Sequence, residues 1–315
     1  MKKQKSIVIA GASGYLGRQL MRHFTEAGHR VTGLSRHRET ACEQFWDGRT
    51  PGAWMKALEG CDLLVNLAGR SVNCRYHRRN REEILRSRVE STRILGVAVN
   101  RCARPPAVWM NSGSATIYRH AEDCPMDEEA GEIGHGFSVE VCLAWEAEFK
   151  ASQALQNGVG PRKVILRSAM VMGPGRDGVF EAFHGIVKRG LGGTLGDGRQ
   201  KVSWIHMKDW FRAIEWIWAH ENLEGAINLS APHPLPNREF MAVLRKVSAQ
   251  PIGLPASRWM LEVGALALRT ETELLLKSRW VLPSRLLKSG FVFRYPDFET
   301  AAREIVGQKA EILKC

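Results

Sequence analysis

The chain of 315 residues carries 45 Lys and Arg against 33 Asp and Glu, which leaves a formal net charge of +12. Its 44% hydrophobic and 25% charged residues exclude collagen-like, disordered and coiled-coil chains, and no apolar run approaches the roughly 18 residues of a membrane-spanning helix. The length predicts two domains or one domain with a large annex, while the charge leaves open a nucleic acid, an anionic membrane surface, a phosphorylated ligand or solubility alone.

The first 35 residues have the pattern of a strand, a glycine-rich loop, a helix and a second strand. The apolar run 7–10 leads into the loop 11–17, whose glycines have the spacing Gly-x-x-Gly-x-x-Gly. Leu16, Leu20 and Phe24 then recur at helical spacing. In this setting the glycines permit a tight turn and bring the backbone and the helix N-terminus close to a pyrophosphate. The unit therefore predicts one half of a dinucleotide-binding fold.

The end of the second strand indicates which dinucleotide binds. An NAD site usually has an acidic residue there, which accepts a hydrogen bond from the ribose 2′-hydroxyl. This chain has Ser35, Arg36, His37 and Arg38, and no carboxylate precedes Glu39. Guanidinium groups can bind a 2′-phosphate through paired hydrogen bonds. We therefore expect NADP, and a solvated basic loop is the alternative.

The N-terminus and the cysteines bear on the compartment. The apolar run after the first lysines ends at Gly11, so it is shorter than the roughly 7–15 residues of a secretory core, and we expect no signal peptide. The seven cysteines are widely spaced and form no Cys-x-x-Cys pair. This pattern argues against a disulfide framework and a zinc site. We expect a cytoplasmic protein without a metal.

Several segments resemble a known superfamily. The glycine spacing and the strand end Asn66-Leu67-Ala68-Gly69 are similar to those of the extended short-chain dehydrogenases/reductases. Later segments narrow the resemblance, namely 87–93, 202–206, 225–232, 281–283 and 289–296. They resemble one atypical branch, the epimerase-family group that includes human short-chain dehydrogenase/reductase family 39U member 1 and its bacterial relatives. The resemblance covers nearly the whole chain, including that family's small C-terminal domain at about 251–300.

The resemblance implies an α/β fold: a Rossmann-type doubly wound parallel sheet with a smaller substrate-side and C-terminal domain. We expect the NADP-binding domain over 1–168 with a return segment at about 203–229, and the substrate-side domain over 169–202 and 230–315. The predicted cofactor-binding residues are Gly11, Ser13, Gly14, Tyr15, Leu16, Gly17, Ser35, Arg36, Arg38, Leu67, Ala68, Gly69, Arg88, Val171 and Met172.

The usual catalytic pair of the superfamily is missing. Its members use a Tyr as acid and base and a Lys four residues later, on the same face of one helix. None of the four tyrosines here, at 15, 76, 118 and 295, is followed by Lys at that spacing. The stretch 137–146 resembles the family's helix and places Ser138 and Cys142 at the expected Tyr and Lys positions.

The third catalytic member is retained. The stretch 111–118 resembles the superfamily's Ser-Ser-x-x-Val-Tyr strand end and places Ser114 at the hydroxyl position. Ser114 is thus a candidate to polarise a substrate carbonyl, and a local hydrogen bond to the backbone is the alternative. Tyr118 is a candidate for a displaced proton donor, and packing on the cofactor-side wall is its alternative.

The segment 202–209 bears on the substrate. Sugar-nucleotide epimerases of the superfamily have an Arg here that binds the substrate phosphate, whereas this chain has Val202. A UDP- or dTDP-sugar is therefore disfavoured, and the small-molecule substrate stays unknown. We interpret His206 as a packed core histidine and Asp209 as the N-cap of a helix over 210–214.

Two further regions leave alternatives open. Residues 70–93 hold eight arginines, which favour a solvated helix face or an anion site that includes Arg75 and Arg88. The stretch lacks the interleaved aromatic residues that stack on bases, so we expect no nucleic-acid partner, and no membrane partner either. Apolar stretches at 240–244 and 259–268 predict a lid over a substrate cleft, a hydrophobic core or the face of a homodimer.

Two functions fit these features. The retained Ser114 favours an NADP-dependent oxidoreductase or epimerase-like enzyme. The missing pair favours a catalytically weak NADP-binding protein that senses the cofactor or docks a partner.

Replacing Arg36 tests the cofactor prediction. Arg36→Asp should weaken NADPH binding far more than NADH binding, because it removes a cation from the predicted 2′-phosphate site and adds a repelling carboxylate. Fluorescence titration with both nucleotides measures the two dissociation constants. Equal losses for NADH and NADPH would refute the choice of NADP.

Overall fold

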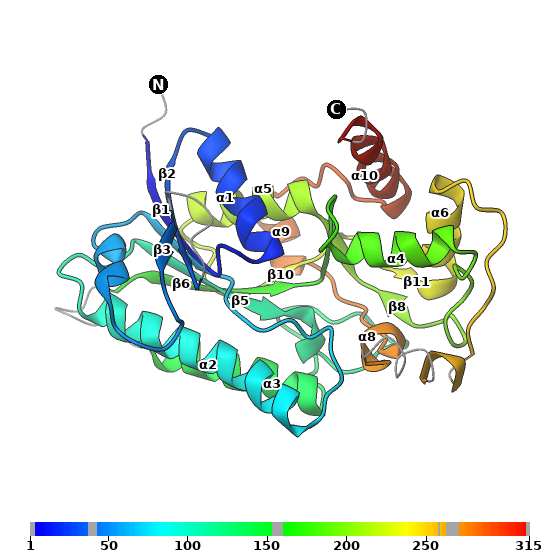
Figure 1. Cartoon of the computed structure of the whole chain (residues 1–315), viewed down its shortest axis with the longest axis horizontal. Coiled ribbons are helices and arrows are strands. Elements are labelled where there is room, and N and C mark those ends of the chain that lie inside the picture. Colours follow the sequence, from blue (N-terminus) through cyan, green and yellow to red (C-terminus); the bar gives the residue numbers. More distant parts are fainter. Residues whose placement is uncertain (1–3, 37–42, 153–159, 258, 263–270, 313–315) are drawn as a thin grey trace.

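The computed structural model describes residues 4–36, 43–152, 160–257, 259–262 and 271–312. Its centre is a sheet of seven strands in the order β10-β6-β5-β4-β1-β2-β3, and every pairing in it is parallel. The chain thus moves outward from β1 in one direction and then in the other, which confirms the predicted Rossmann-type doubly wound fold (Figure 1).

Helices cover both faces of this sheet. The strands are β1 (Ser6–Ala10), β2 (Arg30–Ser35), β3 (Glu43–Phe45), β4 (Leu63–Asn66), β5 (Val108–Ser114), β6 (Arg162–Ser168) and β10 (Gly225–Leu229). One face packs against α1 (Tyr15–Glu26), α5 (Met207–Ala219) and α9 (Ser284–Lys288). The opposite face packs against α2 (Arg78–Asn100) and α3 (Phe137–Ala151), which lie side by side in Figure 1. Short 3-10 helices occur at Ala53–Leu58 and Ala115–Ile117.

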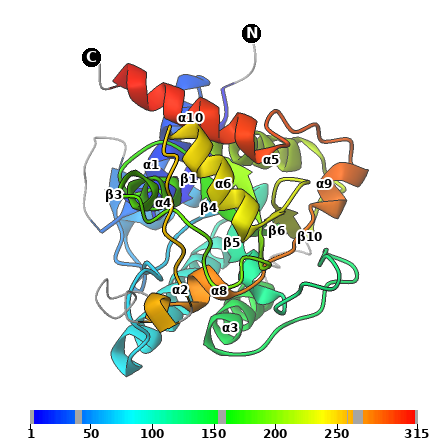
Figure 2. The ribbon, with the colours of Figure 1, turned by 90° about the vertical axis from the view of Figure 1, so that its right-hand side faces the viewer.

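A second unit lies beside the carboxyl ends of the central strands. It contains two small sheets, β7 (Met170–Met172) with β9 (Trp204–His206) and β8 (Lys201–Val202) with β11 (Leu235–Pro236). Its helices are α4 (Val179–Lys188), α6 (Asn237–Val247), α8 (Glu273–Leu276) and α10 (Phe298–Ile312), of which α6 and α10 pack together (Figure 2). Phe240, Met241 and Leu244 are buried in its core, so a hydrophobic core is the correct interpretation of 240–244.

The glycine-rich loop forms as predicted. Leu20 and Phe24 of α1 are buried against the sheet. A Cβ atom at Gly17 would lie 2.2 Å from the Gly11 carbonyl oxygen, and Gly11 itself has a φ of +82°. Only glycine fits these two positions without moving the backbone.

A buried polar network connects four elements beneath the loop that follows β4. The Asn66 amide donates to Asn111 Oδ1 at 2.7 Å and to Thr92 Oγ1 at 3.2 Å, and its oxygen accepts from the Ala68 N–H at 3.1 Å. Trp145 of α3 also donates to Thr92 Oγ1, at 3.0 Å. Because these groups satisfy one another away from water, they orient the loop relative to α2 and α3.

A buried ion pair joins α3 to β6. The Arg167 guanidinium forms two hydrogen bonds with the Glu146 carboxylate, at 2.8 and 2.9 Å, and both side chains are at most one-tenth exposed. The arginines of α2 behave differently, because Arg78 and Arg79 are exposed and pair with glutamates one turn away. A solvated helix face is therefore the correct interpretation for these arginines.

The structure confirms one prediction at the start of α5 and corrects another. His206 is 1% exposed, and its Nε2 lies 2.9 Å from Glu304 Oε2, so it is a packed core histidine. The N-cap of α5 is His206, however, whose Nδ1 accepts from the Lys208 N–H. Asp209 lies in the first turn and accepts from the N–H groups of Arg294 and Tyr295. The predicted N-cap was wrong because Asp209 connects α5 to a segment distant in sequence.

No helix among the described residues is long and apolar enough to cross a membrane.

Removing one partner of the buried ion pair should destabilise the fold. Glu146→Leu should lower the free energy of unfolding by about 3–5 kcal/mol, because it leaves the Arg167 charge buried without its counterion. The matched control is Glu148→Leu, which breaks the more exposed pair with Arg93 and should cost about 1 kcal/mol or less. Urea unfolding measures both values, and similar losses would contradict the assigned role of Glu146.

Candidate functional site

A cleft of about 370 Å³ opens at the carboxyl ends of β1, β4 and β5. In doubly wound sheets ligands bind at this edge, where the strand order reverses. The predicted cofactor-binding and catalytic residues that line the cleft are Tyr15, Leu16, Leu67, Ala68, Gly69, Arg88, Ser114 and Val171. Residues that are up to 156 positions apart in sequence, such as Tyr15 and Val171, thus meet at one site.

The other predicted cofactor-binding residues fall into four groups. Gly11, Ser13, Gly14 and Gly17 form the turn before α1 and its first residues, while Ser35 and Arg36 lie at the end of β2. Arg38 lies outside the described residues. The prediction for Met172 was wrong, because it is fully buried in the core of the second unit. Successive side chains of a strand point to opposite sides, so Val171 faces the cleft and Met172 does not.

Two contacts hold the loop after β7 against the glycine-rich loop. The Tyr15 hydroxyl donates to the Pro174 carbonyl at 2.8 Å, and Arg18 Nη2 lies 2.6 Å from Asp177 Oδ2. Burial and then the Asp177 charge raise the pKa of Tyr15, so its hydroxyl stays protonated. The N–H groups of the first turn of α1 have no partner within the helix. The contacts of Tyr15 and Arg18 place the loop after β7 next to this end of the helix.

Arg88 is the basic residue of the 70–93 stretch that reaches the cleft. Its Nη1 donates to the carbonyl oxygens of Arg70 and Ile84, each at 3.0 Å, and its guanidinium lies 5.2 Å from the Trp145 ring. A Cβ atom at Gly69 would lie 3.1 Å from this guanidinium. Arg75, the other candidate for an anion site, forms an ion pair with Glu271 at 3.6 Å and does not line the cleft.

A buried carboxylate that we did not predict lies beside the end of β2. The Ser35 hydroxyl donates to Glu43 Oε2 at 2.8 Å, and both side chains are buried. Glu43 lies on β3, which pairs with β2, so its position could not be read from the residues that directly follow β2. Arg36 is exposed beside this pair.

Ser114 forms a local hydrogen bond with the backbone and also lies in the candidate site. Its Oγ accepts a hydrogen bond from the Thr116 N–H at 3.2 Å, and the residue lines the cleft. The backbone bond uses an acceptor site of the hydroxyl, so the hydroxyl proton is available to a ligand oxygen. Ser112, Ser138 and Ser168 add further hydroxyl-bearing residues to the cleft lining.

Tyr118 is not part of the cleft. Its side chain is 2% exposed, its hydroxyl donates to Asn228 Oδ1 at 2.9 Å, and it accepts from Arg167 Nη1 at 2.9 Å. The prediction of a displaced proton donor was therefore wrong, whereas its alternative fits better, because Tyr118 packs in a cluster with Cys142, which lines the cleft. The ring packs among buried residues that include Met126 and Val281.

The helix predicted to carry the catalytic pair is α3, and its register is as expected. Ser138 and Cys142 both line the cleft. Burial raises the pKa of Cys142 to about 11, so its thiol is neutral at physiological pH. Ser138 Oγ donates to Glu273 Oε2 at 2.9 Å, and the Tyr76 hydroxyl is hydrogen-bonded to Ser138 as well. Tyr76 is thus a tyrosine of the site that its sequence neighbours did not reveal.

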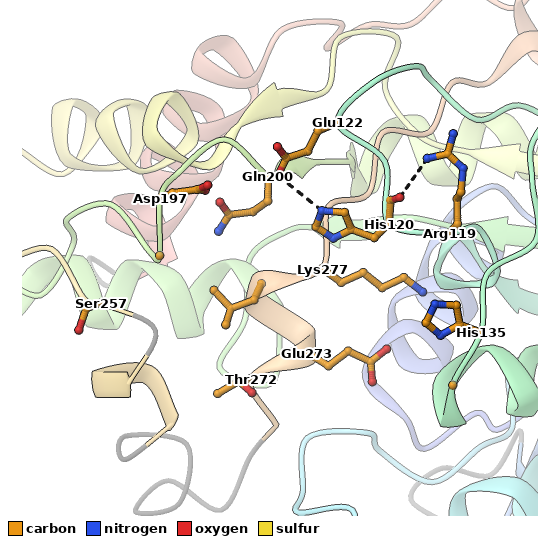
Figure 3. A pocket seen from close by; sticks show the side chains of 13 residues that line it. Arg119, His120, Glu122, His135, Asp197, Gln200, Ser257, Thr272, Glu273 and Lys277 are labelled. Atoms are coloured by element: carbon orange, nitrogen blue, oxygen red, sulfur yellow. Dashed lines mark hydrogen bonds and ion pairs between the residues drawn. The ribbon is translucent and has the colours of Figure 1, made fainter.

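A second, larger cavity of about 940 Å³ adjoins the cleft. Its lining residues are Arg119, His120, Glu122, His135, Gly136, Gly196, Asp197, Gln200, Ser257, Thr272, Glu273, Leu276 and Lys277 (Figure 3). Two hydrogen bonds join the two linings, from Ser138 to Glu273 and from Lys277 Nζ to the Thr116 carbonyl at 2.8 Å. The cavity residues were missed because they come from distant segments that share no motif.

Ten of the thirteen residues that line the larger cavity have polar or charged side chains. Arg119 is held by Asp123 and Glu132, at 2.8 and 2.9 Å. Trp259 and Met260 are exposed and line neither cavity, so the predicted lid is not supported at these two residues. Among the described residues no group of three or more His, Cys, Asp or Glu could hold a metal ion.

Two tyrosine variants separate the fold from the site. Tyr118→Phe removes two buried hydrogen bonds and should lower the free energy of unfolding by about 1–3 kcal/mol while leaving the dissociation constant for NADPH unchanged. Tyr15→Phe loses the bond to Pro174 beside the glycine-rich loop and should weaken NADPH binding. Urea unfolding and fluorescence titration measure these effects. Weaker NADPH binding by Tyr118→Phe would contradict this account and would mean that Tyr118 contributes to the site.

Comparisons with known proteins agree with this geometry. The NAD dependent epimerase/dehydratase family matches residues 7–230, and a domain of unknown function, DUF1731, matches residues 256–305. Epimerase family protein YfhF of Bacillus subtilis is 28% identical over 314 residues, which are 98% of this chain and 100% of YfhF. Human epimerase family protein SDR39U1 is 27% identical over 303 residues, 95% of this chain and 99% of SDR39U1.

The similarity extends to a solved structure. The crystal structure of human SDR39U1 (isoform2) with NADPH matches with a TM-score of 0.84 and 26% identity, over 96% of this chain and 99% of that one. The chain therefore belongs to the NAD-dependent epimerase/dehydratase family, in the branch that includes epimerase family protein SDR39U1 and carries the DUF1731 domain.

Proposed function

We propose that this protein is an NADP-dependent oxidoreductase or epimerase-like enzyme that acts on a small molecule with a carbonyl or a hydroxyl group. One observation carries the proposal: Ser114 lines a cleft beside the dinucleotide-binding loop, and this cleft adjoins a cavity of about 940 Å³ whose lining residues mostly have polar or charged side chains. A protein that only stores or senses a dinucleotide does not need a second cavity at this position.

The cofactor part rests on the glycine-rich loop and on the human relative. The missing Cβ atoms of Gly11 and Gly17 leave the first turn of α1 close to the sheet, which suits a pyrophosphate. Human SDR39U1, whose crystal structure contains NADPH, supports the expectation of NADP. In this chain the loop 11–17 would hold the pyrophosphate, Arg36 would face the 2′-phosphate and Ser114 would lie at the nicotinamide end.

The chemistry follows from the side chains at that end. Bound NADPH supplies a hydride, and the oxidised form accepts one. The Ser114 hydroxyl, whose proton is available, donates to a substrate oxygen and polarises the bond at which the hydride is exchanged. The neutral Cys142 and the hydrogen-bonded Ser138 do not provide the tyrosine and the cation of the usual pair.

The substrate is not expected to be a sugar nucleotide bound in the usual way. Val202, which stands where sugar-nucleotide epimerases have an Arg, is buried in β8 and packs in the core of the second unit. The cavity instead offers imidazole, carboxylate, amide and ammonium groups from His120, Glu273, Gln200 and Lys277. A hydrophilic small molecule fits this lining best.

The alternative function is a catalytically weak NADP-binding protein that senses the cofactor or docks a partner. The absent Tyr-x-x-x-Lys pair favours this alternative. It differs from the proposed function in one respect that a structure can measure, which is whether a substrate can reach the nicotinamide.

A crystal structure with NADPH tests the proposal. We expect the nicotinamide in the 370 Å³ cleft, with its reactive C4 facing Ser114 and open to the 940 Å³ cavity. A nicotinamide enclosed by apolar side chains would contradict an enzyme and favour the sensor. A protein that does not bind NADPH would contradict both functions.

A further inference from the structure

The proposed function lacks a proton donor, and this inference rests on that function. Hydride transfer to a carbonyl leaves a negative charge on its oxygen, which an acid must neutralise. On α3 the usual positions of the acid and its cation hold Ser138 and Cys142. An acid that replaces them must come from another element beside the same cleft.

The segment 271–279 of the second unit contacts residues that line the cleft. Glu271 Oε1 accepts from the Tyr76 N–H at 2.5 Å, and Glu273 accepts from Ser138. Lys277 Nζ donates to the Thr116 carbonyl, and Arg279 Nε donates to Thr116 Oγ1 at 3.1 Å. The segment thus contacts the loop before α2, the start of α3 and the residue two positions after Ser114.

Lys277 occupies the boundary between the two cavities. Its side chain extends from the end of α8 along the wall of the larger cavity, near Glu273 (Figure 3). Its hydrogen-bond partner Thr116 lines the smaller cleft. Within the described residues no carboxylate forms an ion pair with Lys277, so a ligand oxygen can take that place.

The surroundings also make the Lys277 ammonium a better acid than an exposed lysine. Burial and then the Arg279 guanidinium lower its pKa, while the Glu273 carboxylate opposes the shift. An ammonium of lowered pKa gives up a proton closer to neutral pH. The other candidates are poorer: Arg279 keeps its proton in proteins, and burial raises the pKa of Tyr76.

We propose that Lys277 is the catalytic acid of this enzyme and that the C-terminal domain supplies it in place of the pair missing from α3. The substrate carbonyl carbon gains the hydride that bound NADPH would supply, so that a C–H bond forms, NADPH is oxidised to NADP, and the electron pair of the C=O π bond moves to oxygen. That oxygen takes a proton from Lys277 Nζ, and the neutral amine regains one from water in the larger cavity. In the reverse direction Lys277 accepts the hydroxyl proton.

The first test compares three variants as full-length proteins with bound NADPH. NADPH oxidation is followed with methylglyoxal, glyceraldehyde and phenanthrenequinone as carbonyl probes. Lys277→Met and Lys277→Arg should each lower turnover at least about a hundredfold. Methionine has no proton to donate, and arginine keeps the charge and the hydrogen bond but does not release its proton. The matched control Lys246→Met, on the exposed side of α6, should keep wild-type turnover.

The pH dependence distinguishes proton donation from a structural role. The reduction needs the protonated ammonium, so wild-type turnover should be constant at low pH and fall as the pH rises through the pKa of Lys277, below the ordinary 10.5. Lys277→Met should lack this decrease. The dissociation constant for NADPH should be the same in wild type and both variants.

A second readout does not depend on activity. Competitive acetylation with acetic anhydride, analysed by mass spectrometry, gives the pKa of Lys277 directly, and we expect a value below 10.5 that matches the decrease in turnover. A value of 10.5 or above would overturn the assignment.

Two kinetic results would also overturn it. Wild-type turnover by Lys277→Arg would mean that charge alone suffices, and a parallel loss of NADPH affinity would mean a structural role. A wild-type protein that binds NADPH but reduces none of the three probes would contradict the proposed function itself, and this inference would fall with it.

Discussion

The close approach of the glycine-rich loop to the sheet is the constraint on which the site depends. A side chain at Gly17 would collide with the Gly11 carbonyl, and one at Gly11 would lie 2.9 Å from the backbone of Ala68. Because these side chains are absent, α1 begins directly above the sheet edge, next to the loop that follows β4. The buried network around Asn66 then fixes that loop, and with it the wall of the cleft that Arg88 and Ser114 share.

Local signals made much of this predictable. Strand, loop and helix are adjacent in sequence at 7–24, so periodicity and glycine spacing were sufficient for the nucleotide half. The resemblance placed Ser114, Ser138 and Cys142 in the correct register, and all three line the cleft. The predicted role of Tyr118 as a proton donor was wrong because its neighbours in sequence do not reveal Arg167 and Asn228, which form hydrogen bonds with its hydroxyl. Side chains whose partners are distant in sequence cannot be assigned from spacing.

The same reason explains why the sequence did not reveal which residues of the second unit contribute to the site. Glu273 and Lys277 lie about 130 to 160 positions from the residues that they contact, and no motif connects them. The structure shows that this C-terminal segment forms part of the site and is not only a cover or a core. If Lys277 is the acid, the DUF1731 domain, which matches 256–305, is required for chemistry, and the loss of the usual pair on α3 is compensated by a residue from another element.

Hydride transfer is the central claim, and isotope transfer tests it most directly. The protein is incubated with NADPH that carries deuterium in the transferable position at C4, together with methylglyoxal or phenanthrenequinone. The reduced product of methylglyoxal should contain one deuterium on carbon, which mass spectrometry detects. The reduced quinone gains no C–H bond, so with phenanthrenequinone the loss of deuterium is followed in the NADP that forms. Deuterium transfer of this kind, dependent on the protein, is the result that our account predicts. NADPH that binds and keeps its deuterium with either probe would contradict it.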